Sequence, residues 1–212
     1  MLDIIIVGAG GFGREVYQWS KDAFNQDEYR IKGFLSKDSN ELDEFAIDAP
    51  ILGHEDDYQI QDNDRFIIAI GNVAIKKNVV ESLKSKGASF VSLIHPTAIV
   101  APSVKIGEGV VICPYSILTD SVIIGDYVML NVYVYCGHDS KVGKYSILSP
   151  YSTLNGYASL EDEVFLATHS VVTGYKNVGS KSVIGANSLV LHDVEGESKV
   201  LGLSEKKTQV DS

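Results

Sequence analysis

A histidine beside a carboxylate is the pair in this sequence best suited to moving a proton. His138 is followed directly by Asp139. Imidazole changes its protonation near neutral pH, so it is the usual general base when an amine or a hydroxyl attacks a thioester. A neighbouring carboxylate orients the ring and raises its basicity. We therefore predict a catalytic role for His138 and Asp139; the alternative is that His138 is one of five histidines and merely faces solvent.

The second half of the chain, which carries this pair, repeats every six residues. Four residues after each aliphatic position of the repeat stands a small or β-branched residue, with Lys176 as the exception. A period of six fits neither the α-helix, at 3.6, nor the flat strand, at 2. The seventeen aliphatic or cysteine positions are Ile94, Val100, Ile106, Ile112, Leu118, Ile124, Leu130, Cys136, Val142, Leu148, Leu154, Leu160, Leu166, Val172, Val178, Ile184 and Val190.

A chain that turns a corner every six residues explains this repeat. Three sides of six then make one coil, and one large and one small side chain per side fill a triangular prism. Lys176 at an inward position predicts a local bulge over residues 173–176. Four glycines that recur at whole multiples of this coil are predicted on one corner, where a missing Cβ permits a positive φ or a close approach. They are Gly107, Gly125, Gly143 and Gly179.

The same frame orients the candidate base. Cys136 is an inward position, so His138, two residues later, is predicted to face outward. Three other histidines are predicted to be structural. His95 precedes Pro96 at the start of the repeat, His169 has no acidic neighbour, and His192 is followed by Asp193.

Residues 1–93 have a different character, because strand-like and helix-like segments alternate there. This alternation predicts a small parallel sheet of βαβ units. The expected strands are 4–7, 29–35, 65–70 and 90–93, and the expected helices are 14–24 and 74–86.

A glycine-rich loop follows the first expected strand. Gly8, Gly10 and Gly13 fit the dinucleotide-binding spacing, and backbone N–H groups at a helix start suit a phosphate. A nicotinamide dehydrogenase is not favoured, because about 90 residues are too few for two mononucleotide-binding halves. Ser36 also stands where the acidic residue at the end of the second strand is expected. A purely structural βαβ cap is the alternative.

The charge balance and the cysteine content argue against several kinds of partner and compartment. The chain has 18 basic and 28 acidic residues, a net charge of −10, which argues against nucleic acid or an anionic membrane as the main partner. Its apolar N-terminal run is far too short to span a membrane and lacks a basic leader, so we expect no membrane insertion. Cys113 and Cys136 form no paired motif, which fits a reducing cytoplasm.

The hexapeptide pattern resembles that of the left-handed β-helix acyltransferases. The leading segment GAGGFGREV on a short βαβ domain narrows the resemblance to the bacterial sugar O-/N-acyltransferases of the NeuD/PglD-like group. It implies a Rossmann-like nucleotide-sugar-binding domain over 1–93, a left-handed parallel β-helix over 94–194 and a C-terminal tail over 195–212. It also implies acetyl-CoA as co-substrate, no metal, and a homotrimer with active sites between the subunits.

The resemblance assigns further residues to the β-helix site. Gly156 is implied to give a backbone N–H to the oxyanion, and Asn131 to line the acceptor side. Thr168 and Ala186 are implied to meet the pantetheine arm of CoA. Ile147 stands where the family often has a second histidine near CoA and the acceptor, so that contact is lost or replaced. A plain corner glycine is the alternative for Gly156.

In the N-terminal domain, the family holds the pyrophosphate of a nucleotide sugar with the loop that is here Gly11-Phe12-Gly13. The Asp-Asp pair that typically recognises the base corresponds to Ser36 and Lys37, a departure from the family. A second patch, implied to face the sugar nucleotide, corresponds to Gly71, Asn72 and Lys77.

These assignments predict an acetyl-CoA-dependent N-acetyltransferase that acts on a UDP- or dTDP-linked amino-dideoxy sugar for surface polysaccharide or glycan synthesis. A sugar O-acetyltransferase, acting on sialic acid or a polysaccharide, is the first alternative, and a non-catalytic sugar-nucleotide-binding scaffold is the second. The γ-class carbonic anhydrases share the prism but need an H-x4-H pair, which this chain lacks. The segment 201–204 replaces the Gly-x-Pro-Ala end of many relatives.

Overall fold

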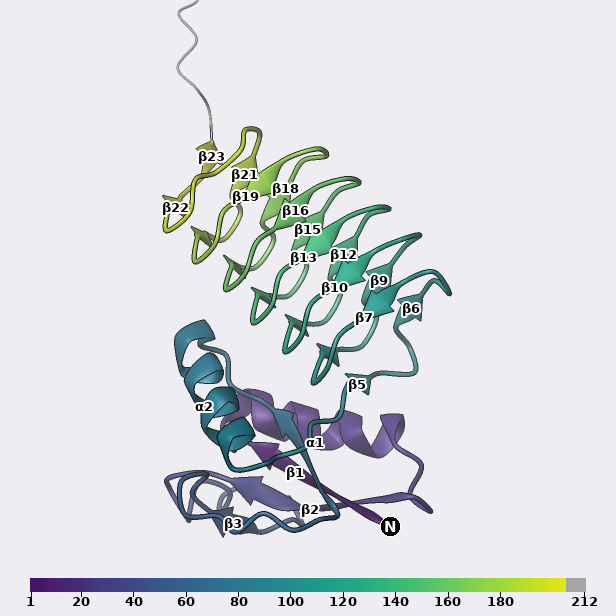
Figure 1. The fold of residues 1–212 in the computed structure, drawn as a ribbon, viewed down its shortest axis with the longest axis vertical. Helices are drawn as coiled ribbons and strands as arrows, with labels where there is room; N and C mark the ends of the chain where they lie inside the picture. Colours follow the sequence, from purple (N-terminus) through teal and green to yellow (C-terminus); the bar gives the residue numbers. More distant parts are fainter. Residues whose placement is uncertain (205–212) are drawn as a thin grey trace, which may run out of the picture.

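The computed structural model describes residues 1–204, which form an α/β domain followed by a parallel β-helix (Figure 1). The domain has a parallel sheet with the strand order β3-β2-β1-β4. Its elements are β1 (Leu2–Val7), α1 (Gly11–Ala23), β2 (Tyr29–Leu35), β3 (Ile51–Gly53), β4 (Asp64–Ile68) and α2 (Val73–Ser85). The sequence predicted both helices and three of these strands within a few residues. It missed β3.

The central strand β1 is buried on both faces, as expected where helices cover both sides of a parallel sheet. Ile4 and Ile6 pack in one core cluster with Val16 of α1, and Ile5 and Val7 pack in another with residues of α2. The β-helix continues both clusters. Residues on the outer side of its first strands join the α1 cluster, and two of its tyrosines join the α2 cluster.

Three parallel sheets form the walls of the β-helix, and most strands pair with the third strand further along the chain, which confirms the predicted three-sided coil. Sheet 1 contains β5 (Leu93–Ile94), β8 (Val111–Ile112), β11 (Met129–Leu130), β14 (Ile147–Leu148), β17 (Phe165–Leu166), β20 (Val183–Ile184) and β22 (Lys199–Val200). Sheet 2 contains β6 (Ile99–Val100), β9 (Ile117–Leu118), β12 (Tyr135–Cys136), β15 (Thr153–Leu154), β18 (Val171–Val172), β21 (Leu189–Val190) and β23 (Leu203–Ser204). Sheet 3 contains β7 (Lys105–Ile106), β10 (Ile123–Ile124), β13 (Lys141–Val142), β16 (Ser159–Leu160) and β19 (Asn177–Val178).

The predicted inward residues fill the prism. From Ile112 to Val190 every aliphatic position of the frame is buried, and each such side chain contributes about 1.5–3 kcal/mol relative to exposure. Seven serines at the small inward positions are also at most 1% exposed. The first coil is the exception, because it lies at the end of the stack. Ile94 is 39% exposed there, although the frame predicts it inside.

From Ile112 to Ile184, the corners of the prism impose a left-handed backbone conformation on the third residue after each inward aliphatic position. Within residues 1–204, fourteen non-glycine residues have φ between 55° and 63°, and seven of the eleven tyrosines are among them. Side chains at this position stack between successive coils. We name the corners by position: the tyrosine corner lies between sheets 1 and 2, the His138 corner between sheets 2 and 3, and the docking corner between sheets 3 and 1.

The recurring glycines lie on the docking corner, as predicted. Their φ is not positive, so of the two predicted reasons for glycine, positive φ is wrong and close approach of the backbone is confirmed. A Cβ on Gly143 would lie 2.3 Å from the backbone of Glu161 in the next coil. The predicted bulge at 173–176 is wrong. β16 still pairs with β19 in regular register through Ser159 and Asn177, and Lys176 stays partly exposed.

The β-helix extends beyond the predicted boundary at 194. β22 pairs with β20 through Lys199 and Val183, and β23 pairs with β21 through Leu203 and Leu189. These partners are closer in sequence than those of the regular coils, so the last coil is shorter and leaves the six-residue frame. Part of the predicted tail therefore belongs to the prism, and residues 205–212 lie outside the described part of the chain.

Neither α1 nor α2 has the length and apolar character that crossing a bilayer requires, and no other helix in residues 1–204 does.

Candidate active site

His138 projects outward from the His138 corner, as predicted. Its side chain is 58% exposed, and its Nδ1 lies 3.0 Å from Asp139 Oδ2. The two neighbours can meet because Asp139 has a φ of 59°, which bends the chain at the corner. In a flat strand, adjacent side chains would point to opposite faces. The contact occupies Nδ1 and leaves Nε2 as the nitrogen available to a substrate.

Gly156 lies one coil further on, against the imidazole ring. A Cβ at this position would lie 2.7 Å from His138 Nε2 and 2.8 Å from its Cε1. The backbone also ties the two residues together, because the N–H of Tyr157 donates to the carbonyl of His138 at 2.9 Å. Only glycine leaves room for the ring in this position.

The backbone N–H of Gly156 is one of several N–H groups, at equivalent corner positions, that take no part in the backbone hydrogen bonds between neighbouring coils. At the equivalent position Glu108 donates this N–H to Asp126 of the next coil at 3.1 Å, and Lys144 donates to Asp162 at 2.8 Å. The residue one coil beyond Gly156 is Gly174, which has no side chain to accept such a bond. An oxyanion bound here could take the place that a carboxylate occupies elsewhere.

Tyr157 forms one wall around the histidine. Its ring meets that of His138 edge to face, with centroids 5.2 Å apart, and stacks on Tyr175 at 4.8 Å. The Asp139 carboxylate raises the pKa of the Tyr157 hydroxyl. His138 therefore sits between a carboxylate, a glycine and an aromatic ring, all from two successive coils.

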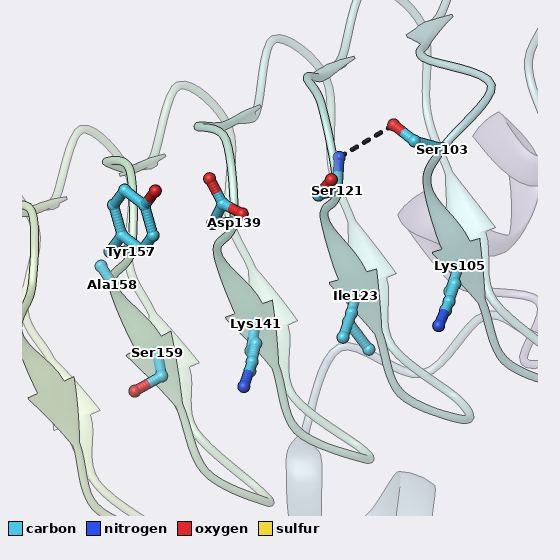
Figure 2. A pocket seen from close by; sticks show the side chains of 9 residues that line it. All are labelled: Ser103, Lys105, Ser121, Ile123, Asp139, Lys141, Tyr157, Ala158 and Ser159. Atoms are coloured by element: carbon cyan, nitrogen blue, oxygen red, sulfur yellow. Dashed lines mark hydrogen bonds between the residues drawn. The ribbon is translucent and has the colours of Figure 1, made fainter.

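A groove of about 480 Å³ runs from this corner across the outer face of sheet 3 (Figure 2). Asp139 and Tyr157 line one side, and one side chain from each of four successive strands forms a row that crosses sheet 3. The row holds Lys105, Ile123, Lys141 and Ser159. This volume is in the range of small-molecule sites, and the two lysines make it suited to an anionic ligand.

The other predicted β-helix residues lie on a different corner. Asn131, Thr168 and Ala186 each follow a strand of sheet 1, so they belong to the tyrosine corner. Asn131 Oδ1 accepts a hydrogen bond from the N–H of Val132 at 2.7 Å. Within one chain these residues do not come together with His138.

Two side chains that were predicted to bind ligands instead make contacts with other residues of the same chain. Ile147 is 3% exposed and packs in the cluster beneath α1, so it offers a ligand almost no surface. Lys77 Nζ lies 2.6 Å from Glu163 Oε1 and links α2 to the docking corner. The pairing raises the pKa of the Lys77 ammonium.

The remaining predicted residues lie at the carboxyl ends of β1, β2 and β4. Gly11 and Phe12 begin α1, and a Cβ on Gly13 would lie 2.0 Å from the carbonyl oxygen of Gly8, so glycine is required there. Ser36 follows β2, and the neighbouring Lys37 is exposed to solvent.

Gly71 and Asn72 line a second groove, of about 460 Å³, between the start of α2 and the β-helix. Asn72 is also the N-cap of α2, because its side chain accepts a hydrogen bond from the N–H of Ile75 at 3.0 Å.

Sequence reasoning missed one acid at this edge. Glu41 comes from the segment after β2, yet its carboxylate reaches the glycine-rich loop, and Ser36 Oγ donates a hydrogen bond to it. An acid five residues after Ser36 was the available signal.

Three other histidines have different surroundings. His54 lies between two carboxylates, with Nε2 3.0 Å from Glu55 and Nδ1 3.3 Å from Asp56, but its side chain is only 17% exposed. His95 is 8% exposed and contacts Thr97 and Asp22, in agreement with its predicted structural role at the start of the β-helix. His169 stacks on Tyr151 at 4.8 Å. Over the described residues, no three histidine, cysteine or acidic side chains gather as a metal site would need.

Comparison with known proteins agrees with both halves of this structure. Residues 3–83 match the PglD N-terminal domain family. A segment of 47 residues is 49% identical to the UDP-N-acetylbacillosamine N-acetyltransferase of Bacillus subtilis, although it spans only 22% of either chain. PerB from Caulobacter crescentus, solved with CoA and GDP-perosamine, matches over 94% of both chains with 25% identity and a TM-score of 0.84. Residues 3–83 therefore belong to the PglD N-terminal domain family, and the chain as a whole shares the fold of PerB.

A further solved structure has the same fold. The acetyltransferase domain of PglB from Neisseria gonorrhoeae in complex with acetyl coenzyme A covers 94% of this chain, with 24% identity and a TM-score of 0.84. Both solved structures therefore share with this chain, over 94% of its length, the arrangement of an α/β domain followed by a parallel β-helix.

Proposed function

We propose that this protein transfers the acetyl group of acetyl-CoA to the amine of a nucleotide-linked amino-dideoxy sugar, with His138 as the general base. The observation that carries the proposal is the outward imidazole, whose Nδ1 is held by Asp139 and whose ring lies against Gly156. The named activities of the relatives support it. One is an N-acetyltransferase of a UDP-sugar, and another was solved with CoA and GDP-perosamine.

The reaction assigns one task to each group. The neutral amine attacks the thioester carbonyl, and the nitrogen then carries an extra proton, which His138 Nε2 accepts. The negative charge that develops on the carbonyl oxygen is stabilised by the Gly156 N–H; one such donor contributes about 2.7–4 kcal/mol to transition-state stabilisation. Collapse of the tetrahedral intermediate breaks the C–S bond, and CoA leaves as the thiol after taking up a proton.

The complete site requires two copies of the chain. His138 lies on one corner of the prism, whereas Asn131, Thr168 and Ala186 lie on another. Side-by-side prisms would bring the His138 corner of one subunit to the tyrosine corner of the next. Repeating that heterologous contact around a threefold axis closes a ring. We accordingly propose a homotrimer with three shared sites, working in the cytoplasm, where its two buried cysteines remain reduced thiols.

The decisive experiment measures thiol release from acetyl-CoA with UDP-, GDP- and dTDP-linked amino sugars, the corresponding free amino sugars, and sialic acid as a hydroxyl acceptor. We expect release with a nucleotide-linked amine and a product acetylated on nitrogen by mass spectrometry. Release with sialic acid alone would favour the O-acetyltransferase. No release with any acceptor, together with nucleotide-sugar binding, would favour the scaffold.

A further inference from the structure

The glycine-rich loop has an acidic neighbour that comes from an unexpected part of the chain. In nucleotide-binding sheets of this kind, an acid at the end of the second strand accepts hydrogen bonds from the ribose hydroxyls. Ser36 occupies that position, and its Oγ donates to Glu41 Oε2. A side chain on Gly10 would come within 3.5 Å of Glu41 Oε1. The second carboxylate oxygen therefore faces the loop.

Several local contacts hold Glu41 in this position. Ser36 Oγ accepts the N–H of Asp38 at 3.3 Å, which directs its own hydrogen towards Glu41. The N–H of Glu41 donates to the carbonyl of Asp38 at 3.3 Å. Leu42, the next residue, is 7% exposed and is anchored in the core beneath α1. The turn after β2 thus returns the carboxylate to the strand end.

Positive charge lies on the other side of the loop. The start of α1 has no acidic residue in its first turn and no side-chain cap, so its N–H groups and dipole suit an anion. The Arg14 guanidinium lies near Gly11 and over the ring of Phe45, 3.6 Å from its centroid. An anion and a hydroxyl donor are thus both accommodated around one loop, which is the pattern of a nucleoside diphosphate.

We propose that Glu41, held by Ser36, accepts a hydrogen bond from the ribose 2′-hydroxyl and so selects a ribonucleotide-linked sugar. This inference rests on the proposed function, because it assumes a nucleotide-linked acceptor. A dTDP-sugar lacks the 2′-hydroxyl and would leave the Glu41 oxygen without its donor. UDP- or GDP-linked amino sugars are then the substrates, and dTDP-linked ones are not.

Calorimetric titration of the full-length protein with UDP, 2′-deoxy-UDP, GDP and 2′-deoxy-GDP tests the proposal. We expect the wild type to bind each ribonucleotide about 10- to 100-fold more tightly than its deoxy form, as for one hydrogen bond to a charged group. In Glu41→Ala this preference should fall to within about twofold, and Ser36→Ala should reduce it in part. Glu44→Gln, an exposed acid of the same segment, is the matched control and should keep it.

Three results would overturn the inference about Glu41, and a fourth would overturn the proposed function on which it rests. An unchanged 2′-hydroxyl preference in Glu41→Ala would mean that another group reads the ribose. A changed ratio of UDP to GDP affinity with the same deoxy penalty would mean that Glu41 reads the base. A wild type that binds ribo and deoxy forms equally would show no ribose selection. Absence of binding by all four nucleotides would instead remove the nucleotide-linked acceptor of the proposed function.

Discussion

The His138 corner and the docking corner share one backbone design but treat their polar groups differently. Both place residues in the left-handed conformation, and both stack tyrosine rings between coils. On the docking corner, Tyr127 and Tyr145 are 3% and 8% exposed beneath α2, and their hydroxyls donate to Glu108 and Glu81. On the His138 corner, the corresponding Tyr157 is 48% exposed.

This difference teaches where the chain can do chemistry. The docking corner uses its donors and acceptors internally: Lys144 pairs with Asp126 at 2.8 Å, and buried Lys76 donates to the carbonyls of Tyr127 and Ser146. The His138 corner leaves an imidazole nitrogen directed outward. A satisfied corner fixes two domains together, and an unsatisfied one is free to bind a substrate.

The largest effect should come from removing the imidazole. His138→Ala should lower kcat by about 10²–10⁴-fold, the usual contribution of a general base, while the thermal midpoint stays nearly constant because the side chain is largely exposed. Thiol release from acetyl-CoA measures the rate. His192→Ala is the matched control, since His192 is also exposed and also precedes an aspartate, and it should keep the wild-type rate. Equal losses in both variants would remove the contrast between the corners.

A smaller effect should follow from crowding the same ring. In Gly156→Ala the new Cβ would lie 2.7 Å from His138 Nε2, so the exposed ring must move. A displacement of about 1 Å costs up to about 10²-fold in rate, and stability should change little because the ring can swing into solvent. Combining the change with His138→Ala provides the check. If Gly156→Ala lowers the residual rate just as much without the imidazole, displacement of the ring is not the cause.

The regular part of both corners could be predicted because the β-helix repeats its environment. Each inward residue meets its own equivalents one coil before and one coil after it, so one frame determined the strands, the pairing and the outward direction of His138. The frame failed where the repeat ends, at exposed Ile94 and in the shortened last coil. It also failed at Lys176, which needed no bulge.

Features set by contacts between distant segments could not be predicted. Ile147 is buried because α1, more than a hundred residues earlier, covers sheet 1, and nothing in the six-residue frame indicates that cover. Glu41 reaches the glycine-rich loop through a turn whose geometry depends on Ser36. The assignments of Asn131, Thr168 and Ala186 stay predictions, because no contact within one chain brings these residues to His138.

The contacts of the docking corner should make the free energy of unfolding depend on pH and should leave the catalytic rate unaffected. Lys76 is 1% exposed, and burial lowers the pKa of its ammonium to about 7. Between pH 7 and the ordinary lysine value the unfolded chain binds more protons than the folded one. The free energy of unfolding should therefore rise with pH, by up to about 1.4 kcal/mol per unit. Below pH 7 both states hold the proton and this contribution to the slope disappears.

Urea unfolding of the wild type and Lys76→Met at pH 6 to 9 measures this slope. We expect the wild type to gain stability relative to Lys76→Met as the pH rises above 7. Lys84→Met, an exposed lysine on the same helix, should follow the wild-type curve. Parallel curves for the wild type and Lys76→Met would mean that the two carbonyls keep the ammonium charged throughout.

The smallest effect compares two tyrosine hydroxyls that share one backbone conformation. Tyr145→Phe removes a donor to Glu81 beneath α2, so it should lower the free energy of unfolding by about 1 kcal/mol. Tyr157→Phe removes a hydroxyl from the open corner, and its stability should stay within about 0.5 kcal/mol of the wild type. Urea unfolding at constant pH measures both. If Tyr157→Phe destabilised the protein as much as Tyr145→Phe, the open corner would be bonded as completely as the docked one, and its availability to a substrate would need another explanation.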